Sequence, residues 1–146
     1  MAKFFALYRS SICAGADGEC DARAGASRHG GLAGVGGNGG GCAVTGEHSM
    51  PTIETAHIRP FSEGGAHELP NGLPLGRDLH RLFDLGYVSA KPTGEFLVSP
   101  RLRKEFANGH TYYALEGQLL RPPSHPAATS DRAPLAWHSE SVFQAT

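Results

Sequence analysis

Two histidines, an asparagine and an aspartate lie within about 30 residues of one another, in an order that could build a hydrolytic site. His57 ends a run typical of a strand, and Asn71 closes the loop that follows. His80 comes next, with Asp84 four positions later on a segment with helical spacing. An imidazole can accept a proton from water, and an imidazole with a carboxylate can hold a divalent cation. The order predicts a site shared by a strand, a loop and a helix.

The spacing of His80 and Asp84 places both side chains on one face of a helix, with Cβ atoms roughly 5–6 Å apart. Such a pair can bind one cation through a ring nitrogen and a carboxylate oxygen. Leu79 and Phe83 form the neighbouring apolar stripe, which would pack the helix on the strands and direct the ligand face towards His57. The pair could instead be an ordinary ion pair along a helix.

The elements that position these residues are predicted from local patterns. Residues 53–58 are rich in β-branched side chains and favour a strand, 60–71 a loop, and 72–75 a short edge strand. A helix is predicted over 77–85, ended by Gly86. Further elements are a hairpin over 87–98, a helix from Ser99 and Pro100 to about residue 108, a strand over 112–115 and a last helix over 135–143. The fold class is α+β.

Composition divides the chain at Cys42. Eleven of the twenty glycines lie in residues 15–41, where ordering is entropically expensive and few side chains can be buried. We expect residues 1–41 to be a glycine-rich, disordered or aberrant N-terminal segment, and residues 42–143 to be the folded domain. A phosphate-binding loop is not indicated, because no strand precedes the glycine run and no Gly-Lys-Ser/Thr follows it.

Charge and apolar content exclude several classes of protein. The 146 residues carry a formal net charge of −1, which excludes a globally cationic coat for nucleic acid. No apolar run reaches the ~20 residues of a membrane span, and the apolar patch near Met1 is too short for a signal peptide. Three cysteines without a Cys-x-x-Cys pair indicate neither a disulfide framework nor a four-cysteine zinc site. These observations predict a soluble, cytoplasmic protein with no membrane partner.

Four sequence motifs occur in a fixed order around the candidate residues. They are CAVTG at residues 42–46, AHIRP at 56–60, NGL at 71–73 and DLHRLFD at 78–84. This string resembles the HNH endonuclease family and its strand–loop–strand–helix ββα-metal motif. The resemblance extends over residues 42–143, and it implies a nuclease that hydrolyses DNA phosphodiester bonds, with DNA restriction or mobile-element processing as its setting.

The resemblance implies a role for each candidate residue. His57, Asn71 and His80 would be the catalytic set, with His57 as general base and Asn71 orienting it through the loop. His80 and Asp84 would bind one divalent metal, with Mg²⁺ or Mn²⁺ favoured over Zn²⁺. Asn71 with Gly72 could also be an ordinary turn.

The nucleic-acid contacts predicted from the sequence are basic. Arg59 lies in the AHIRP motif, and Arg101, Arg103 and Lys104 cluster on one predicted helix, where they could contact phosphates or form a solvated face. His48, His67, His110 and His125 lie among turn residues, and we expect them to be solvated.

The sequence also departs from the family's pattern. Many HNH nucleases place a metal ligand directly before the general base, where this chain has Ala56. Glu54 could supply a further ligand, although strand alternation puts it on the face opposite His57. A second hypothesis therefore stays open: a metal- or DNA-binding module with little or no turnover, or a fragment of a longer nuclease with an upstream recognition domain.

Overall fold

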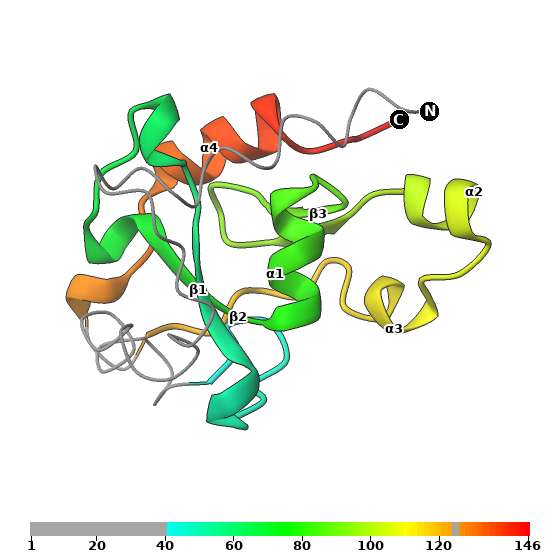
Figure 1. The fold of residues 1–146 in the computed structure, drawn as a ribbon, viewed down its shortest axis with the longest axis horizontal. Coiled ribbons are helices and arrows are strands. Elements are labelled where there is room, and N and C mark those ends of the chain that lie inside the picture. Colours follow the sequence, from blue (N-terminus) through cyan, green and yellow to red (C-terminus); the bar gives the residue numbers. More distant parts are fainter. Residues whose placement is uncertain (1–40, 124–125) are drawn as a thin grey trace, which may run out of the picture.

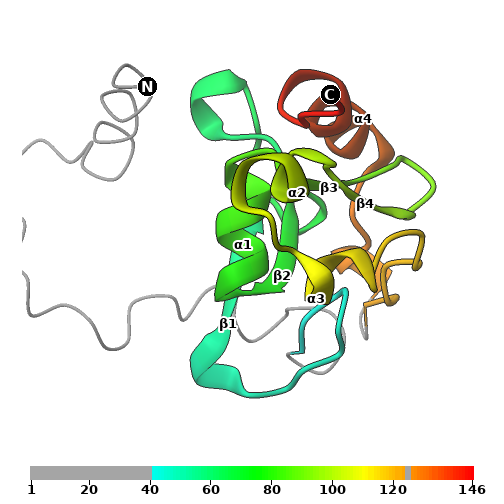
Figure 2. The ribbon, with the colours of Figure 1, turned by 90° about the vertical axis from the view of Figure 1, so that its right-hand side faces the viewer.

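The computed structural model describes residues 41–123 and 126–146. The segment expected to be disordered, residues 1–41, lies outside the described residues apart from Gly41, and so does His125. The described part combines short helices with two two-stranded antiparallel sheets (Figures 1 and 2), which confirms the predicted α+β class. Within this part, no helix has the length and apolar character required to cross a bilayer.

The first sheet carries the candidate site. Strand β1 (Ile53–His57) pairs with antiparallel β2 (Gly72–Gly76), in a register that places His57 opposite Gly72. Both strands agree with the sequence prediction. Three short 3-10 turns adjoin them: η1 (Met50–Thr52), η2 (Phe61–Glu63) and η3 (Leu69–Asn71). The chain therefore leaves β1, forms a compact loop and returns in β2 at the same end of the sheet.

Helix α1 (Arg77–Asp84) follows β2 directly and packs across both strands (Figure 1). Leu79 and Phe83 are the buried residues of this helix, as their spacing predicts. The helix ends before Gly86, whose φ of +75° is costly for any residue with a Cβ. A Cβ at Gly86 would also lie 2.2 Å from the carbonyl oxygen of Val142, so this position requires glycine on two grounds.

The predicted hairpin is confirmed as β3 (Val88–Ala90) and β4 (Phe96–Val98), with Val88 opposite Val98. Helix α2 (Arg101–Phe106) follows at the predicted place, beginning one residue later than expected. Pro100 occupies the N-cap position, and Ser99 Oγ accepts a 3.2 Å hydrogen bond from the Arg101 amide.

The prediction of a strand over residues 112–115 is wrong. This segment contains the end of α3 (His110–Tyr113), which begins after Gly109 at a φ of +109°. The amides of Tyr112 and Tyr113 both donate to the Gly109 carbonyl oxygen, and the Tyr113 hydroxyl donates to the Ser99 carbonyl oxygen at 2.9 Å. These contacts outweigh the β propensity of the two tyrosines.

The last helix, α4 (Arg132–Ser141), follows a 3-10 turn, η4 (Pro126–Ala128), and packs against β3. It begins three residues before the predicted start and ends two residues before the predicted end. Leu135 and His138 are its buried residues, and they join a core that also contains Cys42. Cys42 is fully buried, as expected for a small packing residue rather than a reactive thiol.

His138 is a buried packing residue with a defined protonation state. Its ring stacks on Phe83 with centroids 3.6 Å apart. Its Nδ1 lies 2.8 Å from Ser89 Oγ, and its Nε2 lies 3.2 Å from the Phe83 carbonyl oxygen. Because a carbonyl oxygen can only accept, Nε2 carries the proton and Nδ1 accepts from the serine hydroxyl. Burial lowers the pKa of His138 to about 4, despite the opposing effect of the Phe83 carbonyl.

Acid should therefore destabilise the fold through His138. Between about pH 6.5 and pH 4 the unfolded chain binds a proton at this imidazole and the native chain does not, so the free energy of unfolding falls as pH falls, by about 3 kcal/mol in total. His138→Gln has no titrating ring and should lack this component in urea unfolding at pH 7 and pH 4. Equal pH dependence in the two proteins would contradict a neutral, buried imidazole.

Candidate functional site

His57 stands at the edge of the first sheet, where β1 ends and the loop to β2 begins. Its ring lies edge-on to the ring of His67, with centroids 5.3 Å apart. Partial burial lowers the pKa of His57 below its usual value, and the neighbouring charges of His67 and His80 lower it further, while the Asp84 carboxylate acts in the opposite direction. The imidazole is therefore neutral at neutral pH, the state required of a proton acceptor.

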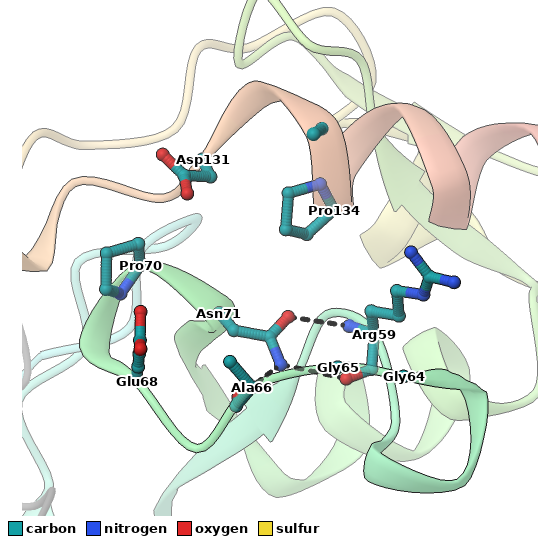
Figure 3. A pocket seen from close by; sticks show the side chains of 10 residues that line it. Arg59, Gly64, Gly65, Ala66, Glu68, Pro70, Asn71, Asp131 and Pro134 are labelled. Carbon is teal, nitrogen blue, oxygen red and sulfur yellow. Dashed lines mark hydrogen bonds between the residues drawn. The ribbon is translucent and has the colours of Figure 1, made fainter.

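Asn71 is buried beneath the loop that follows His57 and joins its two ends (Figure 3). Its Oδ1 accepts a 2.9 Å hydrogen bond from the Arg59 amide. Its Nδ2 donates at 2.8 Å to the carbonyl oxygens of Arg59 and Ala66. The Ile58 amide donates to the Asn71 carbonyl oxygen at 2.9 Å, directly after His57. One carboxamide thus fixes the backbone next to His57. An ordinary turn at Asn71 and Gly72 does not account for these side-chain hydrogen bonds.

The loop held by Asn71 is compact. The Gly65 amide donates to the Pro60 carbonyl oxygen at 2.9 Å, and a Cβ at Gly65 would lie 1.9 Å from the Arg59 carbonyl oxygen, so only glycine fits. Arg59 Nε donates to the Glu63 carbonyl oxygen at 2.6 Å. A cavity of about 240 Å³ separates this loop from the start of α4 (Figure 3).

His80 is oriented from the strand by a carboxylate. Its Nδ1 lies 2.9 Å from Glu54 Oε2, and the other oxygen of Glu54 accepts a 2.8 Å bond from Arg77 Nε. Burial alone would raise the pKa of Glu54, but the bonds from His80 and Arg77 lower it below its usual value. An ionised Glu54 accepts the proton on Nδ1 and leaves the Nε2 lone pair of His80 exposed. The glutamate considered as a further ligand therefore contacts the opposite ring nitrogen.

Asp84 lies one helical turn beyond His80, with Oδ2 3.6 Å from His80 Nε2. The two side chains are partly buried, at 23% and 30% exposure, so they are less free to move apart than a surface pair. The free nitrogen of His80 and a carboxylate oxygen therefore face one another, and they fit two positions of a divalent cation's coordination shell. Among the described residues no group of three His, Cys, Asp or Glu side chains could hold a metal ion.

The predicted basic contacts are distributed over two places. The Arg59 guanidinium lies 5.4 Å from the centre of the Trp137 ring, which ties the loop to α4. Arg101 pairs with Glu105 on α2, and the Arg103 guanidinium lies 4.6 Å above the Tyr113 ring. Lys104 is exposed on the same helix. Three of the four therefore have intramolecular partners.

Sequence reasoning missed one neighbour of the candidate base. His67, expected to be a solvated turn residue, contacts the His57 ring and stacks on Phe61 with centroids 5.1 Å apart. The signal available in the sequence is Pro60 with Gly64 and Gly65, which allow the chain to turn back towards the end of β1.

Residues 42–89 match the family model of the HNH endonucleases. This matched segment, called the HNH module below, is similar to the HNH endonucleases. The match spans β1, the loop, β2 and α1, and so includes all four candidate residues (His57, Asn71, His80 and Asp84). No curated protein matches the chain. The match supports nuclease chemistry as the general class of activity.

Loss of the Asn71 side chain should destabilise the protein. Asn71→Ala removes three hydrogen bonds and leaves partly buried loop groups without their side-chain partner, so we expect the free energy of unfolding to fall by about 3 kcal/mol. Urea unfolding measures the loss, and faster hydrogen exchange at the Arg59 amide would locate it. Asn108→Ala, in an exposed turn, is the matched control. A loss equal to that of the control would show that the carboxamide does not hold the loop.

Proposed function

We propose that this chain is a metal-dependent DNA endonuclease in which His57 is the general base and His80 and Asp84 bind one divalent cation. The observation that carries the proposal is the convergence of two structures within the HNH module. A histidine whose pKa is lowered by partial burial ends β1, and a histidine–aspartate pair lies on the helix packed over the same strand. Two protein ligands are fewer than the three or four of a zinc site, whereas Mg²⁺ and Mn²⁺ are commonly held by few protein ligands, with water and substrate oxygens in the remaining positions.

His57 would take a proton from a water molecule aligned with the scissile phosphorus. The water oxygen then bonds to phosphorus, and the bond from phosphorus to the 3′ oxygen breaks, leaving a 5′-phosphate and a 3′-hydroxyl once the leaving oxygen gains a proton. When bound, the cation supplies positive charge to the phosphoryl and leaving oxygens. His80 would present Nε2 to it, Asp84 one carboxylate oxygen, and Glu54 would keep the His80 ring in its tautomer.

Asn71 would act through the backbone, as a positioning residue. Its hydrogen bonds fix the peptide groups that follow His57, so the imidazole does not need to be ordered when substrate binds. Arg101, Arg103 and Lys104 on α2 would contact the phosphate backbone away from the scissile bond. We place the activity in DNA restriction or mobile-element processing, the setting implied by the family resemblance.

A second candidate function is a metal- or DNA-binding module without useful turnover. It is favoured by Ala56, which cannot coordinate, and by the pair of facing ligands where a stronger site would have three. Metal or DNA binding is compatible with both candidates, so the dependence of cleavage on His57 separates them.

Substituting His57 should abolish cleavage and spare binding. We expect wild type to convert supercoiled plasmid to nicked or linear DNA with Mg²⁺ or Mn²⁺ and not with EDTA. His57→Ala should reduce the rate by at least the 10²–10⁴-fold of a lost general base. His110→Ala, an exposed histidine on α3, is the control and should cut like wild type. Equal cutting by His57→Ala would refute the base assignment, and no cutting by folded wild type would favour the binding module.

Metal affinity should depend on both facing ligands and on the glutamate behind them. We expect His80→Ala and Asp84→Asn to abolish Mn²⁺ binding in calorimetry. Glu54→Gln should weaken it about 10- to 100-fold, because the imidazole loses its orienting acceptor. Asp78 lies on the same helix and accepts a hydrogen bond from the Tyr112 hydroxyl. The control variant Asp78→Asn should bind Mn²⁺ like wild type. Unchanged affinity in the His80 or Asp84 variant would place the metal elsewhere.

A further inference from the structure

An exposed aromatic pair lies beside His57 and has no part in the mechanism proposed above. Phe61 is 71% exposed, and its ring stacks on His67 at an interplanar angle of 24°. His67 in turn touches His57 edge-on. Two successive ring contacts therefore connect the proposed general base to a large apolar surface in solvent.

The loop holds Phe61 in place without covering it. Its carbonyl oxygen accepts a 3.0 Å bond from the Gly64 amide, and the Glu63 amide donates to Pro60 at the same distance. Arg59 bonds to the Glu63 carbonyl oxygen across the turn, and Asn71 fixes the base of the loop. A ring presented on so well-bonded a turn loses little freedom when it binds a partner, which raises the affinity it can provide.

We propose that Phe61 and His67 form a stacking platform for a substrate base that lies outside the duplex stack, next to the phosphate attacked at His57. This inference rests on the nuclease function proposed above. It assigns the substrate class: DNA with an unpaired base at the cleavage position is preferred over continuous duplex. Phe61 is the specificity-determining residue, since it makes the exposed face of the platform.

The charges near the platform favour a base over the sugar–phosphate backbone. Glu63 and Glu68 are both exposed on the same loop, where Arg59 is the one basic side chain that bonds across the turn, so the loop has no excess of positive charge to attract the sugar–phosphate backbone to the Phe61 ring. A nucleobase is neutral and flat, and stacking on an aromatic ring tolerates any of the four bases. A base within a duplex has both faces covered by its neighbours, so the platform can reach only one that has left the stack.

The test measures binding by the full chain in EDTA, where cleavage does not occur. Fluorescence anisotropy compares a 12-nucleotide single strand, the duplex of the same sequence and a 12-unit oligomer of abasic tetrahydrofuran phosphates. Phe61→Ala should weaken single-strand binding about 5- to 150-fold, the range for loss of one stacked base, and leave duplex and abasic binding unchanged. Phe61→Tyr keeps the ring and should bind within about twofold of wild type. Leu119→Ala removes an apolar side chain of similar exposure (68%) away from the proposed DNA contacts and should have no effect.

The outcomes separate this inference from the proposed activity. If Phe61→Ala binds the single strand as wild type does, or loses the same factor on the abasic oligomer, the platform is refuted, and plasmid cleavage decides separately whether the nuclease stands. If Phe61→Ala loses affinity for the single strand alone and wild type does not cleave plasmid, the platform is supported and the protein is a binding module. Failure of wild type to bind the single strand also refutes the platform, and plasmid cleavage with Mg²⁺ or Mn²⁺ still decides whether the nuclease stands.

Discussion

The carboxamide of Asn71 is the interaction on which the candidate site depends. A chain that leaves one strand and re-enters the next at the same end of the sheet must satisfy the peptide groups of the intervening loop, and those next to Asn71 are partly buried. Asn71 supplies one acceptor and two donors at that point, and its own peptide oxygen accepts from the residue after His57. The loop can therefore be compact without a core of its own. The position of His57 depends on Asn71, which lies fourteen residues later in the sequence.

Two carboxylates on opposite sides of His80 give its ring a direction. Glu54 on β1 engages Nδ1, and Asp84 on the helix approaches Nε2. Because the glutamate comes from the sheet and the aspartate from the helix, the ring geometry depends on how α1 packs against β1. Leu79 and Phe83 are the buried residues of that helix. Their packing therefore also sets the positions of His80 and Asp84 relative to Glu54.

Most elements were predictable because their signals are local. The strands at 53–58 and 72–75, the helix ended by Gly86 and the hairpin around Gly94 each follow from residue types within a few positions. The prediction of a strand at residues 112–115 was wrong because two backbone amides donate to the Gly109 carbonyl oxygen. These hydrogen bonds form a helical turn despite the β propensity of the two tyrosines. The contact between Glu54 and His80 spans 26 positions, and the placement of His67 against His57 depends on the folded loop. Neither contact produces a periodic pattern of residues from which it could be predicted.

The last residues described have a consequence for the order in which the protein acquires its structure. The Gln144 amide donates to the Gly86 carbonyl oxygen at 2.9 Å, and its side chain donates to the Leu85 carbonyl oxygen at 2.6 Å. These groups complete the end of the helix that carries Asp84, and His138 covers its Phe83. During synthesis on the ribosome, the helix emerges well before the segment that secures its end. The end of the helix that carries Asp84 is therefore completed only after His138 and Gln144 have been synthesised.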